Sequence, residues 1–404
     1  MIDILLSQIF FFITFAILGL IIAKLLRIDN SLGCLTSGVV ASLLLPYLNI
    51  DTGIRASNIY QLVFHIILPI IIFSAAWKIK LKHIVKWFWP ILFLTILGVV
   101  ITSIIVGFGV FSLINHAGFP LIAALLVGII LSSTDPTSIS ASLAKYQAPE
   151  ELTTIIKSES IFNTTAVVLL ISIIFSILNF SESSLQTNTD HIRFFLSALF
   201  GGIIIGSVIG LVTAIIALIF KDTSSTSLLI VFSAFASFYI AINFFNVSGG
   251  ISVTFTAITV KTLLQEHKDK LLNSTSYSFQ WLELLFKSIL FVIMGLIINF
   301  DMLVDQWLAI LYCILCASIA RIAIIYLVSL INKCNVYKLK KGWALIITFS
   351  GMKGAVAIAL TLSLPSNLPY LWTIHSMVFG LVLFTLLVQG PIANRLIKRL
   401  PKTV

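Results

Sequence analysis

The sequence has few charged residues and no long polar stretch. Charged types make up 10% of the 404 residues, where an ordinary soluble domain has roughly a quarter, and hydrophobic types make up 59%. This composition excludes a soluble globular enzyme and a disordered chain. The net charge of +10 does not indicate a nucleic-acid partner, because the cations lie between long apolar runs. The pattern is typical of a polytopic membrane protein, whose partner is the lipid bilayer.

The sequence also has few cysteines and none of the motifs that support enzymatic chemistry. Of its four cysteines, Cys313 and Cys316 form a C-x-x-C inside an apolar run. Small packing residues are favoured there over a redox or metal site, because no histidine or second cysteine pair accompanies them. A nucleotide-binding loop, a metal-ligand cluster and a catalytic triad are missing as well. We therefore expect no enzymatic activity, no catalytic residue and no cofactor.

Thirteen apolar runs approach the length of about 20 residues that a membrane-crossing helix needs. The connections between them are short and leave no separate soluble domain. The predicted fold class is an all-α polytopic membrane protein, with a single transmembrane domain over residues 1–404. The predicted spans are roughly 4–26, 31–48, 59–77, 87–114, 118–144, 153–179, 192–219, 226–245, 248–264, 279–299, 306–331, 342–364 and 370–394.

Lysine and arginine are distributed unevenly among the connections. The odd-numbered loops, with their flanks and the C-terminal tail, hold 20 of the 25 cations, and the even-numbered loops hold 2. Cytoplasmic loops of membrane proteins carry the excess of lysine and arginine. The N-terminus is therefore predicted outside and the C-terminus in the cytoplasm. The lack of a targeting segment or long tail favours the plasma membrane of a bacterium, its inner membrane, as the location.

Ionisable side chains within the spans are few, and each is a functional candidate because a charge in a bilayer is costly. Glu283 and Lys287 lie four residues apart, in the order that favours an ion pair on one helix. A structural ion pair is favoured there over a role in an ion pathway, and both remain open. For His65 and His375, a buried, hydrogen-bonded role is favoured over a proton relay. The remaining candidates are Asp135, Glu159, Arg321 and Lys353.

The fifth span contains a Thr134-Asp135-Pro136 step at membrane depth. Proline lacks a backbone N–H and disfavours the helical conformation of the preceding residue. The freed backbone groups are tolerated within a membrane where they line a cavity. The step therefore predicts a broken helix with a carboxylate at the break.

The twelfth span has a comparable interruption, since Gly351 and Gly354 flank a lysine, Lys353. Two broken apolar segments at matching places in two halves of a chain are typical of inverted-repeat transporters. The match is one of pattern, without sequence identity between the halves. The predicted division places the first repeat at about 4–179, a linking span at about 192–219 and the second repeat at about 226–394.

The sixth span adds a cluster of oxygen-bearing side chains. Glu159 and Asn163 share one helix face, and Ser160 and Thr164 share the adjacent one. Together with Asp135 they offer carboxylate, amide and hydroxyl oxygens, the ligands that suit a hard cation such as Na⁺. The pattern predicts a weakly bound, transported Na⁺ at a midplane site. Polar contacts that merely hold helices together are the alternative.

Five segments resemble motifs of the monovalent cation/proton antiporters of the NhaP and NHE type, in that family's order. Residues 131–136 are similar to its SATDPVA segment, and residues 158–164 to its GESLLND segment. Residues 291–296, 321–326 and 351–357 are similar to FxLxGL, RALSVY and GLRGAVS. Each motif is weak by itself, whereas five of them across nearly the whole chain are specific.

The resemblance implies the fold of NhaA and NhaP, with inverted repeats and two crossed discontinuous helices. It also implies a homodimer, in which a mobile core bundle moves against a dimerisation bundle. Thr134 would give its backbone carbonyl to the ion, with Glu159 and Ser160 in the same shell. Asn163 would position the crossed helices, and Arg321 would pair with Glu159.

Two positions depart from the family pattern. The family's ion-binding aspartate follows the asparagine, where this chain has Thr164. A threonine hydroxyl can ligate Na⁺ but cannot carry a proton near neutral pH. Lys353 stands at an arginine position near Asp135, and a buried lysine, unlike arginine, can lose its proton. Lys353 and Asp135 would then form the proton-exchanging pair.

The expected function is exchange of Na⁺, or of K⁺ or Li⁺, for H⁺ by alternating access at a midplane carboxylate, in the service of pH homeostasis. Asp135 is favoured over Glu159 as the exchanging group, because Arg321 is the expected partner of Glu159. Because Thr164 stands where the family has its ion-binding aspartate, two alternatives to this function remain open. One is exchange or channel-like passage of a different ion or solute. The other is a relative that does not transport and acts as a sensor or scaffold.

Overall fold

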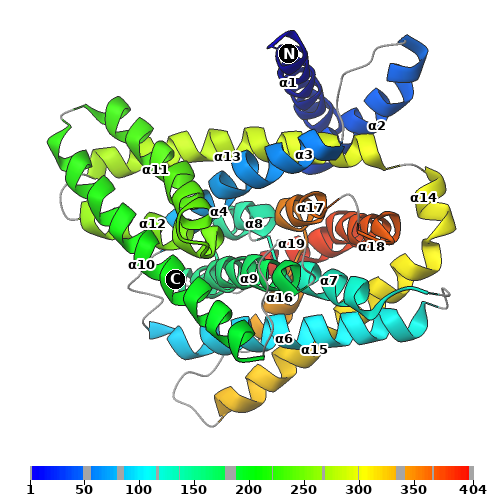
Figure 1. The fold of residues 1–404 in the computed structure, drawn as a ribbon. Coiled ribbons are helices and arrows are strands. Elements are labelled where there is room, and N and C mark those ends of the chain that lie inside the picture. Colours follow the sequence, from blue (N-terminus) through cyan, green and yellow to red (C-terminus); the bar gives the residue numbers. More distant parts are fainter. Residues whose placement is uncertain are drawn as a thin grey trace.

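The computed structural model describes residues 2–48, 56–79, 86–114, 118–135, 137–177, 188–220, 222–265, 269–298, 300–333, 342–365 and 368–399. Within these residues every regular element is a helix (Figure 1). The elements are α1 (Ile2–Leu26), α2 (Asn30–Leu48), α3 (Ala56–Leu62), η1 (Val63–Ile67), α4 (Leu68–Trp77), α6 (Phe88–Leu113), α7 (Leu121–Ser132), α8 (Thr137–Lys145), α9 (Glu150–Ile177), α10 (Asn188–Ile219), α11 (Thr223–Asn243), α12 (Gly249–Leu264), α13 (Asp269–Ile297), α14 (Phe300–Asp305), α15 (Trp307–Lys333), α16 (Trp343–Ser350), α17 (Ala355–Leu362), α18 (Leu371–Phe384), η2 (Thr385–Gln389) and α19 (Gly390–Lys398).

Helices coincide with the predicted spans throughout the described residues. Ten segments are long and apolar enough to cross a membrane, and the shorter apolar helices α2, α7 and α12 fall in the second, fifth and ninth predicted spans. The predicted all-α membrane architecture is confirmed. The outer surface carries large apolar side chains such as Phe10 and Ile204, which are 73% and 61% exposed. Such a surface suits contact with lipid rather than water.

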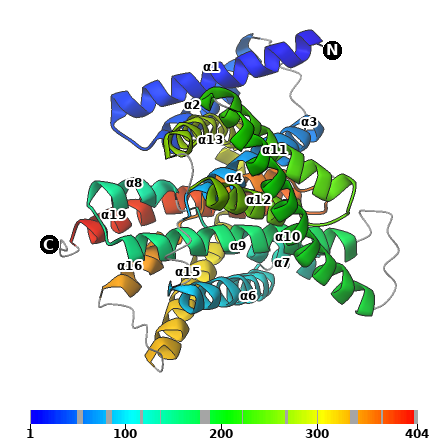
Figure 2. The same ribbon diagram turned by 90° about the vertical axis from the view of Figure 1, so that its left-hand side faces the viewer.

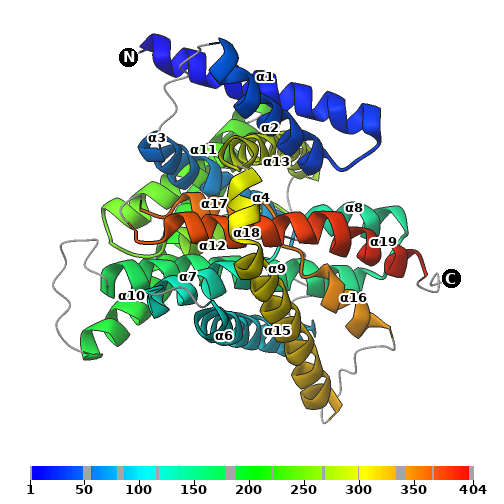
Figure 3. The ribbon, with the colours of Figure 1, turned by 90° about the vertical axis from the view of Figure 1, so that its right-hand side faces the viewer.

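Layers of helices enclose the centre of the molecule. In Figure 2, α1, α2 and α13 lie on one side and α6 and α15 on the other. Figure 3 shows α18 and α19 crossing between these layers, with α17 and α4 nearby. The largest buried apolar cluster extends from α4 and α13 through α7 to α17 and α18. The core therefore surrounds the interrupted helices.

Close packing fixes the position of α13 against α2. A Cβ atom added to Gly38 would lie 2.3 Å from the carbonyl oxygen of Val292, and one added to Gly295 would lie 2.3 Å from that of Leu35. Small residues are the usual means of close helix approach in membranes. With α13 held in this way, its polar residues meet α4 and the first interrupted helix.

The two interruptions occur where the sequence predicts them. Residues 133–136 separate α7 from α8, and residues 351–354 separate α16 from α17. The N–H of Asp135 donates to the carbonyl of Met352 (2.9 Å), so the two interruptions cross each other. Pro136, a predicted cause of the first break, lies outside the described residues. The division of the chain into repeats at the predicted boundaries stays a prediction.

Candidate functional site

The carboxylate of Asp135 lies at the crossing, against the N-terminal end of α17. Its Oδ2 accepts a hydrogen bond from the backbone N–H of Ala355 (3.2 Å), and the residue is 3% exposed. A helix N-terminus carries partial positive charge and unpaired N–H groups, so it stabilises an anion. Gly354 permits this approach, because a Cβ atom there would lie 2.5 Å from Oδ2.

The ammonium of Lys353 lies against the opposite kind of helix end. Its Nζ donates to the carbonyl oxygen of Ser133 (3.0 Å), which follows the last residue of α7. A cation is favoured at a helix C-terminus for the same electrostatic reason. Lys353 therefore lies close to Asp135, as expected. Its contact is with the backbone carbonyl of Ser133, two residues before Asp135. Pairing of the two side chains stays a prediction.

A different ammonium contacts the Asp135 carboxylate, and it comes from α13. The Nζ of Lys287 lies 3.4 Å from Oδ1 of Asp135 and 2.8 Å from Oε1 of Glu283. The local Glu283–Lys287 ion pair that the sequence favours is therefore present, and Lys287 reaches the crossing as well. This second contact joins residues 152 positions apart, which a local sequence pattern cannot indicate.

Glu283 extends this contact to α4. Its Oε2 accepts hydrogen bonds from Nζ of Lys78 (2.6 Å) and from the hydroxyl of Ser74. Sequence reasoning missed both partners, since it assigned Lys78 to a loop and Ser74 carries no charge. Lys78, Glu283, Lys287 and Asp135 form a continuous set of ion pairs, called the ion-pair series below. The charges alternate along it, so each buried charge has an opposite neighbour.

Glu159 of α9 forms an ion pair with Arg321 of α15. The guanidinium contacts both carboxylate oxygens, with 3.0 Å between Nη2 and Oε2. Nη2 also donates to the carbonyl of Ile347 in α16 (2.7 Å), and Nδ2 of Asn163 donates to Oε1 (3.3 Å). A bidentate arginine contact is strong and geometrically specific. The structure thus brings Glu159, Asn163 and Arg321 together as the resemblance implies.

A cavity of about 20 Å³ adjoins the Asp135 carboxylate. In its wall, the hydroxyl of Thr134 donates to that of Ser160 (3.0 Å). A volume of roughly 10–15 Å³ holds one water molecule, so the cavity has room for one water or one dehydrated monovalent cation. Most of its surface is apolar, and the polar residues around it carry oxygens of the kind that bind a hard cation. The polar residues of its lining are Thr134, Asp135, Ser160, Thr164, Glu283 and Lys287.

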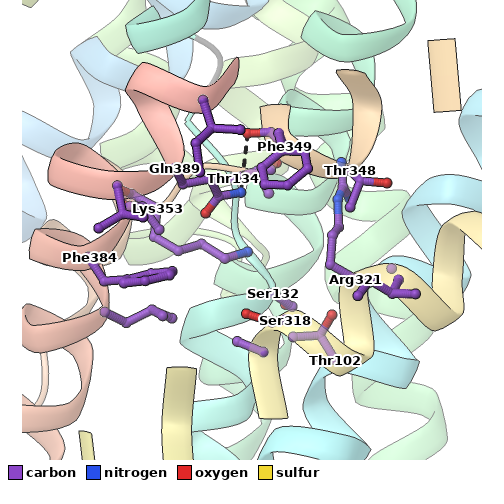
Figure 4. Close-up of a pocket in the computed structure, with 18 of the residues that line it drawn as sticks. Thr102, Ser132, Thr134, Ser318, Arg321, Thr348, Phe349, Lys353, Phe384 and Gln389 are labelled. Atoms are coloured by element: carbon purple, nitrogen blue, oxygen red, sulfur yellow. Dashed lines mark hydrogen bonds between the residues drawn. The ribbon is translucent and has the colours of Figure 1, made fainter. Parts of the chain in front are cut away.

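A second cavity, of about 140 Å³, shares Thr134 with the first (Figure 4). Figure 4 shows the Lys353 side chain extending into it and Arg321 along its wall. The amide of Gln389 donates to the carbonyl of Phe349 across one edge (3.1 Å). Both charged residues of its lining are cations, so this cavity repels a metal ion. The smaller cavity at Asp135 is the better cation site.

A third cavity, of about 230 Å³, lies between the C-terminal end of α4, α8 and the N-terminal part of α9. Its lining includes Lys78, Glu150 and Lys157, together with Ser158. Lys78 belongs to the ion-pair series, and Ser158 directly precedes Glu159. This cavity therefore borders the ion-pair series and the residue that precedes Glu159.

The charged groups around the crossing do not balance when all are ionised. Three carboxylates and four cationic groups lie around it, which leaves an excess of one positive charge among the described residues. A further cation at the site is opposed by this excess unless positive charge leaves or moves away. The groups are Asp135, Glu159, Glu283, Lys78, Lys287, Arg321 and Lys353.

The two histidines within spans lie apart from the crossing. His65 is exposed in η1, with its ring edge-on to Phe64 at 5.2 Å, so the expected buried role is wrong for it. The reason is that η1 presents this residue at the surface of the bundle. His375 stacks on Phe379 at 5.3 Å between ring centroids. Among the described residues, neither imidazole contacts the charged groups of the crossing.

The sequence is similar to a family of transmembrane exchangers and to individual antiporters. A family model described as "Sodium/hydrogen exchanger, transmembrane" matches residues 10–399. The chain is 33% identical over 350 residues to the Na⁺/H⁺ antiporter ApNhaP of Aphanothece halophytica, covering 84% of this chain and 65% of that protein. It is 27% identical over 402 residues to the Na⁺/H⁺ antiporter NhaH of Halobacillus dabanensis, covering 97% of each.

The fold is similar to that of a solved antiporter structure. The sodium proton antiporter MjNhaP1 of Methanocaldococcus jannaschii superposes with a TM-score of 0.82, at 19% sequence identity. The superposition covers 98% of this chain and 99% of that one. At this level of identity the likeness establishes the fold alone.

Proposed function

The chain belongs to the sodium/hydrogen exchanger family, and from that membership and the site at the helix crossing we propose that it exchanges a monovalent cation for a proton. The proposed cation is Na⁺, or K⁺ or Li⁺, and the proposed binding group is the carboxylate of Asp135. The exchange is secondary active transport, in which one ion moving down its gradient drives the other.

One observation carries this proposal. Asp135, Thr134, Ser160 and Thr164 are among the residues around a cavity of single-ion size beside two broken helices. Broken helices supply further backbone carbonyls, which are ligands for transported cations. A carboxylate binds a cation or a proton but not both at once, so the same group serves both ions.

The proposed cycle couples this competition to movement. A cation displaces the proton at Asp135 on one side of the membrane, and a proton displaces the cation on the other. Between these steps the crossing moves against the side formed by α1, α2 and α13, which gives alternating access. The cavity of about 230 Å³ beside Lys78 is the proposed route from one side. Glu159, Asn163 and Arg321 hold the crossed helices together during the movement.

A second candidate is favoured by Thr164 and by the excess positive charge around the crossing. In this reading the protein passes a different ion or solute, or does not transport and acts as a sensor or scaffold. The hydroxyl of Thr164 supplies no charge to offset a bound cation. The buried Asp135 carboxylate and both helix interruptions favour the exchange function instead.

The protein is an integral membrane protein, and its placement and assembly are part of the proposal. We propose a bacterial inner membrane, with the N-terminus outside and the C-terminus in the cytoplasm, because 20 of 25 cations lie in the odd-numbered loops and their flanks. We also propose a homodimer in which the side containing α1, α2 and α13 forms the fixed frame.

The test is dissipation of a proton gradient in everted vesicles after addition of Na⁺, Li⁺ or K⁺. The native protein is compared with Asp135→Asn and Thr164→Asp. Asp222→Asn is the matched control, because Asp222 is an exposed N-cap of α11 and asparagine caps equally well. We expect native activity that Asp135→Asn reduces to the level of vesicles lacking the protein, while Asp222→Asn leaves it unchanged.

Two results would change the conclusion. Retention of native rates in Asp135→Asn would remove Asp135 as the exchanging group. An inactive native protein that gains activity in Thr164→Asp would identify a scaffold that lacks one carboxylate, and the second candidate function would then replace the first.

A further inference from the structure

The ammonium of Lys287 lies where a bound cation would contact Asp135. Its Nζ is 3.4 Å from Oδ1 of that carboxylate, and its side chain lines the same cavity of about 20 Å³ as Thr134 and Thr164. An ammonium and a metal cation satisfy the same carboxylate oxygen, and like charges a few ångströms apart repel strongly in a buried site. Both cannot occupy this position together.

Lys287 contacts a second carboxylate at a shorter distance than it contacts Asp135. Oε1 of Glu283 lies 2.8 Å from the same Nζ, one helical turn earlier on α13. Glu283 is held in place from α4, since Lys78 contacts its other oxygen at 2.6 Å and Ser74 donates to it. The flexible stem of a lysine lets its ammonium shift between two neighbouring carboxylates without movement of the helix.

We infer that Lys287 is the tethered occupant of the cation site and sets its affinity, giving up its contact with Asp135 and staying on Glu283 when a monovalent cation binds. This inference rests on the proposed function, because it takes Asp135 as the cation-binding carboxylate. A buried carboxylate without a counter-charge is strongly destabilising, and Lys287 supplies that charge whenever the cation is absent.

The other cations around the crossing are engaged elsewhere. Lys78 contacts Oε2 of Glu283 at 2.6 Å. Lys353 donates to the carbonyl of Ser133, and Arg321 is bidentate on Glu159. Lys287 is therefore the cationic side chain placed to compete for the Oδ1 atom of Asp135.

The excess of one positive charge around the crossing opposes cation binding, so movement of the Lys287 ammonium away from Asp135 favours it. When Lys287 contacts Glu283 alone, the positive charge nearest the incoming cation moves away from it. The ion-pair series also links the site to the 230 Å³ cavity, because Lys78 lines that cavity and contacts Glu283. Lys78 therefore lies between this cavity and the carboxylate of Glu283 that holds Lys287.

The experiment measures cation-dependent thermal stabilisation of the purified full-length protein in detergent, titrated with NaCl and LiCl. Choline chloride at equal ionic strength is the blank. The variants are Lys287→Met, which keeps the length but removes the charge, Lys287→Arg, which keeps the charge, and Glu283→Gln, which removes the charge of the alternative acceptor. Lys145→Met is the matched control, because Lys145 is an exposed lysine at the end of α8.

Removing the tethered charge and removing the charge of its alternative acceptor have opposite expected effects. Lys287→Met lowers the half-saturating cation concentration by about tenfold or more, the scale of removing a like charge from contact with a bound ion. Glu283→Gln raises it, because the ammonium then remains on Asp135. Lys287→Arg and Lys145→Met stay within about twofold of native. If Lys287→Met does not fold, the rise in Glu283→Gln still tests the inference.

The outcomes separate this inference from the proposed function. Equal cation affinity in native, Lys287→Met and Glu283→Gln proteins, with loss of binding in Asp135→Asn, would overturn the role of Lys287 and leave the cation site intact. Absence of cation-dependent stabilisation in every protein would overturn the proposed function and the inference with it. Stabilisation that appears first in Lys287→Met would support both.

Discussion

Of the two acids Glu159 and Asp135 at the crossing, Glu159 is bound more strongly by its partners. Glu159 is clamped by a bidentate guanidinium and an amide, whereas Asp135 has a backbone N–H and an ammonium at 3.4 Å. Releasing a carboxylate from a bidentate arginine costs more than releasing it from a single longer contact. Asp135 is therefore the group suited to exchange partners, and Glu159 is suited to hold the structure.

This difference predicts the effect of neutralising Glu159. Glu159→Gln leaves the buried Arg321 without a counter-charge, so we expect a loss of about 3–5 kcal/mol in the free energy of unfolding. The double variant Glu159→Gln/Arg321→Met removes both charges and should regain a large part of that loss. Chemical denaturation in detergent micelles measures each value. A single variant as stable as the native protein would contradict the structural role of this pair.

At the scale of helices, the crossing depends on two broken segments whose ends carry compensating charges. Asp135 faces the N-terminal end of α17, and Lys353 faces the C-terminal end of α7. Each charge has the sign that a helix terminus of that kind stabilises. The close approach of the two segments leaves no room for a side chain at Gly354, whose added Cβ would lie 2.5 Å from Oδ2 and 3.0 Å from Cβ of Asp135.

Gly354→Ala is therefore expected to displace Asp135 from α17. We predict a loss of about 1–3 kcal/mol in stability, the usual cost of overpacking, together with at least a tenfold loss of cation-driven proton release in vesicles. Gly98→Ala is the control, because the nearest atom to its added Cβ would be Nδ2 of Asn163 at an ordinary 3.6 Å. In that variant alanine is expected to raise stability by about 0.5–1 kcal/mol, as it does for other glycines within helices. Equal behaviour of the two variants would contradict the tight crossing.

At the scale of the whole molecule, the fold joins an apolar exterior to a charged centre. Large apolar side chains are exposed on several outer helices, including Phe10 on α1, Ile204 on α10 and Ile319 on α15. The carboxylates of the crossing and Lys353 are buried between these layers, and Lys78, Lys287 and Arg321 are partly buried. The cavity lined by Lys78 and Lys157 borders one end of the ion-pair series.

The loop charges predict one orientation of this molecule in the membrane. A fluorescent reporter that matures in the cytoplasm, fused after Val404, should be bright, and a periplasmic phosphatase at the same point should be inactive. The converse fusions before Met1 provide the control. A phosphatase that is active after Val404 would reverse the proposed orientation, and with it the side to which the cavity beside Lys78 opens.

The sequence by itself determined the helices and their interruptions. Apolar runs of membrane length, the Thr134–Asp135 step and the glycines around Lys353 are local patterns, and local patterns fix where a helix continues or stops. The Glu283–Lys287 pair is local for the same reason, since residues four apart share a helix face. The acids and bases within spans were likewise visible as costly residues.

The tertiary structure decided which charges meet. Lys287 faces Asp135 from 152 positions away, and Ser74 reaches Glu283 from 209 positions away. These contacts depend on how α13 packs against α2 and α4, through glycine contacts that involve the backbone of distant helices. A sequence pattern reports the face of a helix but not its neighbour. The partner of Asp135 therefore emerged from packing rather than from the motif that contains it.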